Sequence, residues 1–128
     1  MTLPQPRCVI VVEDDDNIAA ALEYVVAREG LTCERLANGH DAISRIRDRR
    51  PDLVLLDIML PGSSGYDVCA EIRRSPELDL VRILMMTARG SASEQRKAIS
   101  LGADGFISKP FDLADLRREM RRLLAQPV

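Results

Sequence analysis

Residues 51–62 decide the fold: they read PDLVLLDIMLPG, in which four apolar residues, Leu53–Leu56, run directly into Asp57. An apolar run without alternation is typical of a parallel strand that is covered on both faces. The segment Cys8–Val12 repeats this pattern and runs into the acidic residue Glu13. Two such segments predict a parallel sheet with helices packed on both sides.

Strand-like and helix-like segments alternate along the whole chain. The strand-like runs are Cys8–Val12, Thr32–Leu36, Leu53–Leu56, Val81–Met86 and Gly105–Ile107. Apolar residues recur at helical spacing in the segments between these runs and after the last of them. Because parallel strands are joined by right-handed crossovers, this order predicts an α/β fold of the flavodoxin-like type. It is a doubly wound, five-stranded parallel sheet in the order 2-1-3-4-5, with five helices.

Capping residues mark where several of the helices are expected to begin. Asp16 precedes the first helical segment, and Asp112 precedes the fifth. Ser91 and Glu94 have the spacing of a capping box before the fourth. Such side chains accept hydrogen bonds from the free backbone N–H groups of a first helical turn. We therefore expect these residues to cap the three helices.

Length and composition indicate one globular domain. Hydrophobic residues make up 46% of the 128 residues, which is enough for an aliphatic core. We expect a single domain over residues 1–128, with an ordered core of about 7–125 and loose ends at 1–6 and 126–128. The 18 basic and 20 acidic residues nearly balance, which argues against direct binding to nucleic acid or membrane. The longest apolar runs, such as Val9–Val12, are far too short to span a bilayer, so a cytoplasmic location is the default expectation.

Polar side chains follow four of the predicted strands. Glu13 and Asp14 end the first, Asp57 the third, Thr87 the fourth, and Lys109 closely follows the fifth. Because the carboxyl ends of parallel strands share one edge of a sheet, we expect these side chains to converge there. Clustered carboxylates repel one another unless a cation neutralises them, and Mg²⁺ prefers oxygen ligands. Asp14 and Asp57 are the predicted Mg²⁺ ligands, with Glu13 acting directly or through water.

Asp57 is also the predicted nucleophile of this site. A carboxylate can attack phosphorus and form an aspartyl phosphate, and the transferring group then needs cations and hydrogen-bond donors on its oxygens. Lys109 supplies a compact cation and Thr87 a hydroxyl donor. We also expect backbone N–H groups just after Asp57, around Ile58 and Met59, to contribute.

Four stretches of the chain carry a specific resemblance to a known family. They are Val11–Asp15, Pro51–Gly62, Met86–Arg89 and Gly102–Phe111. Over about Arg7 to Ala125, the chain resembles the receiver domains of two-component response regulators. The resemblance implies that Asp57 is the phosphoacceptor and that Glu13 and Asp14 form the acidic pair for Mg²⁺. It implies contacts of Thr87 and Lys109 with the phosphoryl group. It further implies that the backbone carbonyl of Met59 is a metal ligand and that Phe106 is the aromatic switch that moves with Thr87.

The same resemblance implies partners. The phosphodonor is a sensor histidine kinase or a phosphotransfer protein, and the output is a downstream effector domain or protein. The surface that changes is formed by the fourth helix, the fifth strand and the fifth helix, through which such domains also form homodimers. Glu119 and Gly105 depart from the charged pattern of one dimerising subgroup, which argues against its dimer geometry. The cognate kinase, the pathway, the output, the oligomeric state and the phosphate lifetime stay open.

Three alternatives compete with a phosphorylated switch. An Mg²⁺-dependent phosphatase of the haloacid dehalogenase type also uses a strand-end aspartate, but it needs a second aspartate where this chain has Met59. A flavin-binding electron carrier needs a phosphate-binding loop after the first strand, where Glu13 and Asp14 repel phosphate. A degenerate receiver that only docks partners would not need the full set of site residues. Beyond its own phosphoryl transfer and dephosphorylation, no enzyme activity is expected.

Overall fold

A five-stranded parallel sheet forms the centre of the molecule in the computed structural model, which describes residues 7–125. The predicted loose ends, 1–6 and 126–128, lie outside the described residues. The elements in chain order are β1 (Cys8–Val12), α1 (Asp16–Arg28), β2 (Thr32–Leu36), α2 (Gly39–Arg49), β3 (Leu53–Asp57), α3 (Gly65–Arg73), the short 3₁₀ helix η1 (Pro76–Leu78), β4 (Arg82–Thr87), α4 (Ala92–Ser100), β5 (Gly105–Ser108) and α5 (Leu113–Ala125). The strand order is β2-β1-β3-β4-β5, which confirms the predicted doubly wound arrangement.

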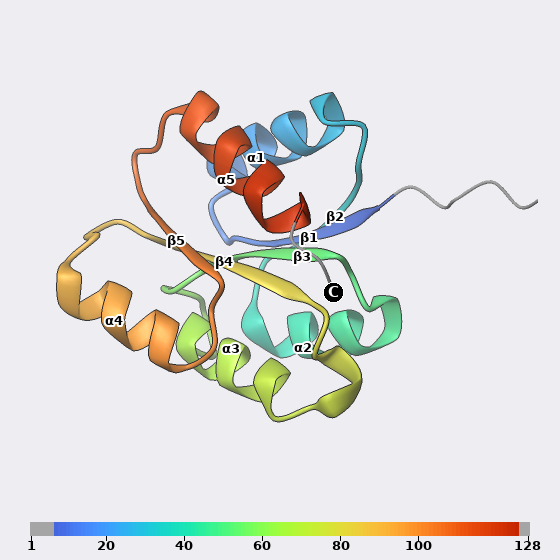
Figure 1. Cartoon of the computed structure of the whole chain (residues 1–128), viewed down its shortest axis with the longest axis vertical. Helices are drawn as coiled ribbons and strands as arrows, with labels where there is room; N and C mark the ends of the chain where they lie inside the picture. The colour runs from blue at the N-terminus through green and yellow to red at the C-terminus, as the bar shows by residue number, and fades with distance from the viewer. Residues whose placement is uncertain (1–6, 126–128) are drawn as a thin grey trace, which may run out of the picture.

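Helices cover both faces of the sheet. Figure 1 shows α1 and α5 on one face and α2, α3 and α4 on the other. Successive residues of β1 divide between these layers: Ile10 and Val12 pack toward α2 and α3, whereas Val9 and Val11 pack toward α1 and α5. Every side chain of this strand from Val9 to Val12 is therefore buried. This two-sided burial is the physical reason for the unbroken apolar runs.

The strand register aligns the carboxyl ends of the central strands. Val12 of β1 lies opposite Leu56 of β3, and Asp57 lies opposite Met86 of β4. Thr87 pairs in turn with Ser108 of β5. The third, fourth and fifth strands thus each run one residue further than their apolar segments predicted, because the ladder continues into the polar residues. The edge that carries these residues is the one where ligands bind in folds of this type.

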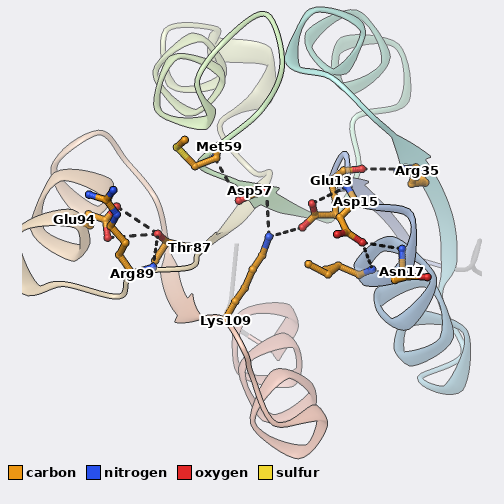
Figure 2. A network of polar contacts seen from close by, with 11 residues as sticks. Glu13, Asp15, Asn17, Arg35, Asp57, Met59, Thr87, Arg89, Glu94 and Lys109 are labelled. Carbon is orange, nitrogen blue, oxygen red and sulfur yellow. Dashed lines mark hydrogen bonds and ion pairs between the residues drawn. The ribbon is translucent and has the colours of Figure 1, made fainter.

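The helix caps match the sequence expectations with one exception. Asp15, and not Asp16, caps α1: its Oδ1 accepts hydrogen bonds from the N–H groups of Asn17 at 2.9 Å and Ile18 at 3.0 Å. The prediction of Asp16 was wrong by one residue, since Asp16 already belongs to the first turn and pairs with Arg35 at 3.0 Å. Figure 2 shows the Asp15 cap beside the acidic edge.

The other two caps agree with their predictions. Ser91 and Glu94 form the expected capping box on α4. Asp112 accepts a hydrogen bond from the N–H of Ala114 at 2.7 Å, at the start of α5. Among the described residues, none of the helices is both long and apolar enough to cross a membrane.

Candidate functional site

Three carboxylates meet at the carboxyl edge of the sheet. Glu13, Asp14 and Asp57 each offer one oxygen, and these oxygens all lie within 4.8 Å of one another. Glu13 and Asp57 are buried, with 1% and 4% of their surface exposed, whereas Asp14 faces solvent. Asp14 and Asp57, which are 43 positions apart in the chain, therefore lie together as predicted. An all-oxygen donor set that opens to water on one side fits the preference of Mg²⁺ for oxygen ligands and retained waters.

Lys109 lies between two of these carboxylates. Its Nζ is 2.6 Å from Glu13 Oε1 and 3.1 Å from Asp57 Oδ2, and Figure 2 shows the side chain reaching both from the segment after β5. The backbone N–H of Lys109 donates to the carbonyl of Thr87 at 2.6 Å, which holds this segment against the end of β4. Burial disfavours the charged form of the amine. The hydrogen bond to Glu13 and the charge of Asp57 outweigh that burial and raise the pKa of Lys109.

Glu13 is the most enclosed of the three carboxylates. Burial raises its pKa, and the hydrogen bonds from Lys109 and from the N–H of Asp15 only partly oppose that effect. Arg35 of β2 donates from Nε to the Glu13 carbonyl oxygen at 2.9 Å and thereby ties the acidic turn to the edge strand. The site thus brings the negative charges of Glu13 and Asp57 together in a buried position, and Lys109 partly neutralises them.

Lys109→Met is expected to lower the free energy of unfolding by about 2 kcal/mol. The change leaves buried Glu13 and Asp57 without their cation, and an uncompensated buried charge is costly. Urea unfolding followed by circular dichroism measures the loss. Lys97→Met is the matched control, because Lys97 is the only other lysine and lies exposed on α4. The control is expected to lose less than about 1 kcal/mol, and equal losses in the two variants would contradict the prediction.

The segment after Asp57 holds the backbone close to the site. The N–H of Met59 donates to Asp57 Oδ1 at 3.3 Å, while Met59 as a whole is 74% exposed. The N–H of Ile58 instead donates to the Met86 carbonyl at 3.0 Å. Of the two N–H groups expected to contribute, that of Ile58 is therefore already bonded within the sheet, beside the last β3–β4 register pair, Asp57 and Met86.

Gly65, the first residue of α3, lies directly against the end of β3. Its N–H donates to the Ile58 carbonyl at 2.8 Å. A Cβ at this position would come within 2.1 Å of the Asp57 carbonyl oxygen and 2.8 Å of the Ile58 Cα. Contacts this short require the backbone to move. Gly65 therefore permits α3 to begin beside Asp57, which goes beyond the turn that the sequence alone predicts.

Thr87 lies at the same edge, but its hydroxyl is engaged elsewhere. The side chain is buried, and Oγ1 lies 3.4 Å and 3.3 Å from the two carboxylate oxygens of Glu94. The N–H of Arg89 also donates to Thr87 Oγ1, at 3.3 Å. Figure 2 shows this group facing α4, apart from the contacts between Lys109 and Asp57. The structure thus places Thr87 at the expected strand end with its hydroxyl turned to α4.

Two side chains make contacts that the sequence did not suggest. The sequence pattern identifies Glu94 only as a capping residue; its spacing of seven residues from Thr87 is the available signal for the further contact. Arg35 interrupts an otherwise ordinary edge strand, and nothing in the local pattern shows that it reaches Glu13. Phe106 is half-buried and packs against the core cluster on the face of α2 to α4.

Comparisons with known proteins agree with this geometry. The family model of the response regulator receiver domain matches residues 9–121. The phosphate regulon transcriptional regulatory protein PhoB of Rhizobium meliloti strain 1021 is 37% identical over 116 residues, which are 91% of this chain and 51% of that protein. The chain therefore spans about half the length of that relative.

Solved structures give the same result. A crystal structure from Chloroflexus aurantiacus J-10-fl, assigned as a response regulator, superposes with a TM-score of 0.90 at 34% identity and covers 95% of this chain and 100% of its own. The receiver domain of sensor histidine kinase PA1611 from Pseudomonas aeruginosa PAO1 has a TM-score of 0.87 at 25% identity, with coverages of 95% and 100%. In that structure a magnesium ion is coordinated in the active site cleft. The chain belongs to the family of response regulator receiver domains, the signalling modules of two-component systems.

Proposed function

We propose that this protein is a phosphorylation-dependent switch that accepts a phosphoryl group on Asp57 with the help of Mg²⁺. The observation that carries the proposal is the cluster of Glu13, Asp14 and Asp57, whose oxygens lie within 4.8 Å of one another with Lys109 in contact with two of the residues. Asp57 is a buried carboxylate beside the Lys109 cation, and the site is open to solvent on the side of Asp14. This arrangement suits nucleophilic attack by Asp57 on a phosphoryl group. Met59 stands where the phosphatase alternative needs a second aspartate.

The residues that hold the metal in this proposal are Asp14 and Asp57, with Glu13 acting directly or through water. The Met59 carbonyl is the proposed backbone ligand. When bound, Mg²⁺ neutralises the acidic cluster and the phosphoryl oxygens. The raised pKa of buried Glu13 supports a cation here, because a nearby positive charge relieves the cost of keeping that carboxylate ionised.

In the proposed transfer, an Asp57 carboxylate oxygen attacks the phosphorus of a phosphohistidine on the donor protein. The new P–O bond forms as the P–N bond breaks, and the released imidazole nitrogen takes up a proton. Lys109 is already paired with Asp57 Oδ2 at 3.1 Å, so its ammonium group lies where the oxygens of the incoming phosphoryl group gather negative charge. The Thr87 hydroxyl is the proposed further donor to those oxygens once it turns toward Asp57.

The proposed phosphodonor is a sensor histidine kinase or a phosphotransfer protein. A mainly apolar depression lies beside Lys109, between α1 and the start of α5, and it suits the packing of a donor protein next to the nucleophile. Its apolar side chains are Ile18, Ala21, Ala88, Pro110, Phe111 and Leu113. In this proposal the switch acts in the cytoplasm and catalyses only its own phosphorylation and dephosphorylation.

The proposed output is a change in the surface of α4, β5 and α5, read by an effector domain or protein or by a second copy of the chain. Glu119 on this surface pairs with Arg122 within the same helix at 3.0 Å. Arg122 Nη2 lies 3.1 Å from where a Cβ on Gly105 would be. The pairing of Glu119 with Arg122 occupies charges that a second copy could otherwise contact. We therefore expect that a homodimer through this surface does not use the charged pairs of the dimerising subgroup described in the sequence analysis.

Incubation with MgCl₂ and acetyl phosphate, followed by intact-protein mass spectrometry, tests the proposed function. We expect a mass gain of one phosphoryl group, and no gain when EDTA replaces MgCl₂, because the acidic cluster then repels the donor. Acid quenching preserves the acyl phosphate for measurement. An unchanged mass of the wild-type protein in MgCl₂ would rule out the proposal and favour a receiver that only docks partners.

A further inference from the structure

The Thr87 hydroxyl is already committed to an anionic partner. Thr87 is 1% exposed, so water does not compete strongly for its side chain. Both oxygens of the Glu94 carboxylate lie within hydrogen-bonding distance of Oγ1, at 3.4 Å and 3.3 Å. Glu94 is half-buried, whereas the other residues of the first turn of α4, Ala92 and Ser93, are exposed. The carboxylate is thus turned inward, toward the end of β4.

A hydroxyl group has one proton to donate. When the proton of Thr87 is donated to Glu94, the same proton cannot be donated to a phosphoryl oxygen on Asp57. Hydrogen bonds to charged acceptors are stronger than those between neutral groups. We propose that Glu94 is a positioning residue that holds Thr87 in the unphosphorylated arrangement and thereby sets how much phosphoryl binding is needed to switch the domain. This inference rests on the proposed function and adds a regulatory contact to the same site.

The contact also links Thr87 to the start of α4. Glu94 Oε1 accepts from the Ser91 hydroxyl at 3.4 Å and from the Ser91 N–H at 3.5 Å, so one carboxylate serves both the helix cap and the switch residue. Lys97, one turn further along α4, lies 4.4 Å from the centre of the Tyr66 ring on α3. Release of Thr87 changes the hydrogen bonds at this helix end and biases the neighbouring surface between two arrangements.

Beryllofluoride, a mimic of the phosphoryl group, tests the inference without a kinase. Full-length wild-type and Glu94→Ala proteins are titrated with beryllium chloride in excess sodium fluoride and MgCl₂, and binding is followed by amide NMR signals around Asp57 and Phe106. We expect half-saturation at about a tenfold lower concentration in Glu94→Ala, the size expected for loss of one hydrogen bond to a charged group. An unchanged half-saturation would overturn the inference.

Two further variants separate a switch contact from a structural one. Ser91→Ala removes the helix cap but leaves the contact between Thr87 and Glu94, and its half-saturation is expected to match the wild type. In a Thr87→Ala background, Glu94→Ala is expected to have no effect, because the held hydroxyl is already absent. A shift of the same size in that background, or in Ser91→Ala, would overturn the inference.

Glu94→Gln guards against poor folding of the alanine variant. The amide oxygen still accepts from Thr87 but carries no charge, so a smaller shift of about threefold is expected. A shift as large as that of Glu94→Ala would contradict the inference. It would mean that the acceptor oxygen, which Glu94→Gln keeps, does not help to hold Thr87. If wild-type protein binds no beryllofluoride, the proposed function fails; if it binds and the Glu94 variants do not shift, only this inference fails.

Discussion

The Asp57→Asn variant is expected to gain no phosphoryl group from acetyl phosphate under conditions in which the wild type is modified. The two side chains have the same shape, so the core of β3 is retained. The amide oxygen carries no negative charge and is a poor nucleophile toward phosphorus. Loss of the carboxylate also removes a proposed metal ligand, and Mg²⁺ affinity is expected to fall about tenfold.

Asp52→Asn is the matched control for this experiment. Asp52 is an exposed aspartate just before the other end of the same strand, and its Oδ2 accepts from the Cys8 N–H at 2.8 Å. An asparagine oxygen can keep that bond, so phosphorylation is expected to stay at the wild-type level. Peptide mapping after reduction with borohydride identifies the modified residue. A phosphoryl group found on the Asp57→Asn variant would contradict the assignment of the nucleophile.

Gly65→Ala is expected to cost about 3–4 kcal/mol of unfolding free energy, a loss typical of severe overpacking. The added methyl group meets the Asp57 carbonyl oxygen at 2.1 Å and the Ile58 Cα at 2.8 Å, and neither backbone atom can rotate away as a side chain can. Relief of the clash requires α3 to separate from the end of β3, which also displaces the Asp57 carboxylate. Phosphorylation is therefore expected to slow markedly in whatever fraction folds, because small misplacements of a nucleophile reduce its rate strongly.

Gly62→Ala separates this steric effect from the general cost of replacing a glycine. Gly62 has a φ of +80°, but nothing lies within 4 Å of a Cβ built there. Its replacement is expected to cost only about 1–2 kcal/mol, from the left-handed backbone alone. Urea unfolding of the two variants measures the difference. If Gly62→Ala proves as destabilising as Gly65→Ala, the cost of Gly65→Ala does not come from a clash between α3 and β3, and the prediction is wrong.

The local pattern of the sequence was sufficient for the central strands of the sheet and for the meeting of Glu13, Asp14, Asp57 and Lys109 at one edge. Leu53–Leu56 and Cys8–Val12 have no polar alternation because both faces of each strand are buried, so the runs identify central strands directly. Right-handed crossovers then leave few strand orders, and five strands with five helices in this length fit the order 2-1-3-4-5. Asp57 and Lys109 share an edge because both follow parallel strands, and this conclusion needs no knowledge of side-chain positions.

The predictions were wrong where the outcome depended on the exact residue at which a helix begins or a strand ends. Asp15 caps α1 although Asp16 is an equally good capping residue type, since the choice depends on where the turn after β1 ends. The N–H of Ile58 is not available to the site because it bonds to the Met86 carbonyl at the end of the β3–β4 ladder. Both outcomes are decided by hydrogen bonds with neighbouring elements, which a local pattern does not encode.

By itself, the sequence determined a doubly wound sheet whose strand ends gather carboxylates, a hydroxyl and a lysine, because hydrophobic periodicity and crossover handedness act through local rules. Only the tertiary structure decided that Lys109 contacts Glu13 across 96 positions, that Thr87 is held by Glu94, and that Gly65 lies against β3. These contacts depend on side-chain rotamers and on the packing of elements far apart in the chain, and both are settled only when the whole core assembles.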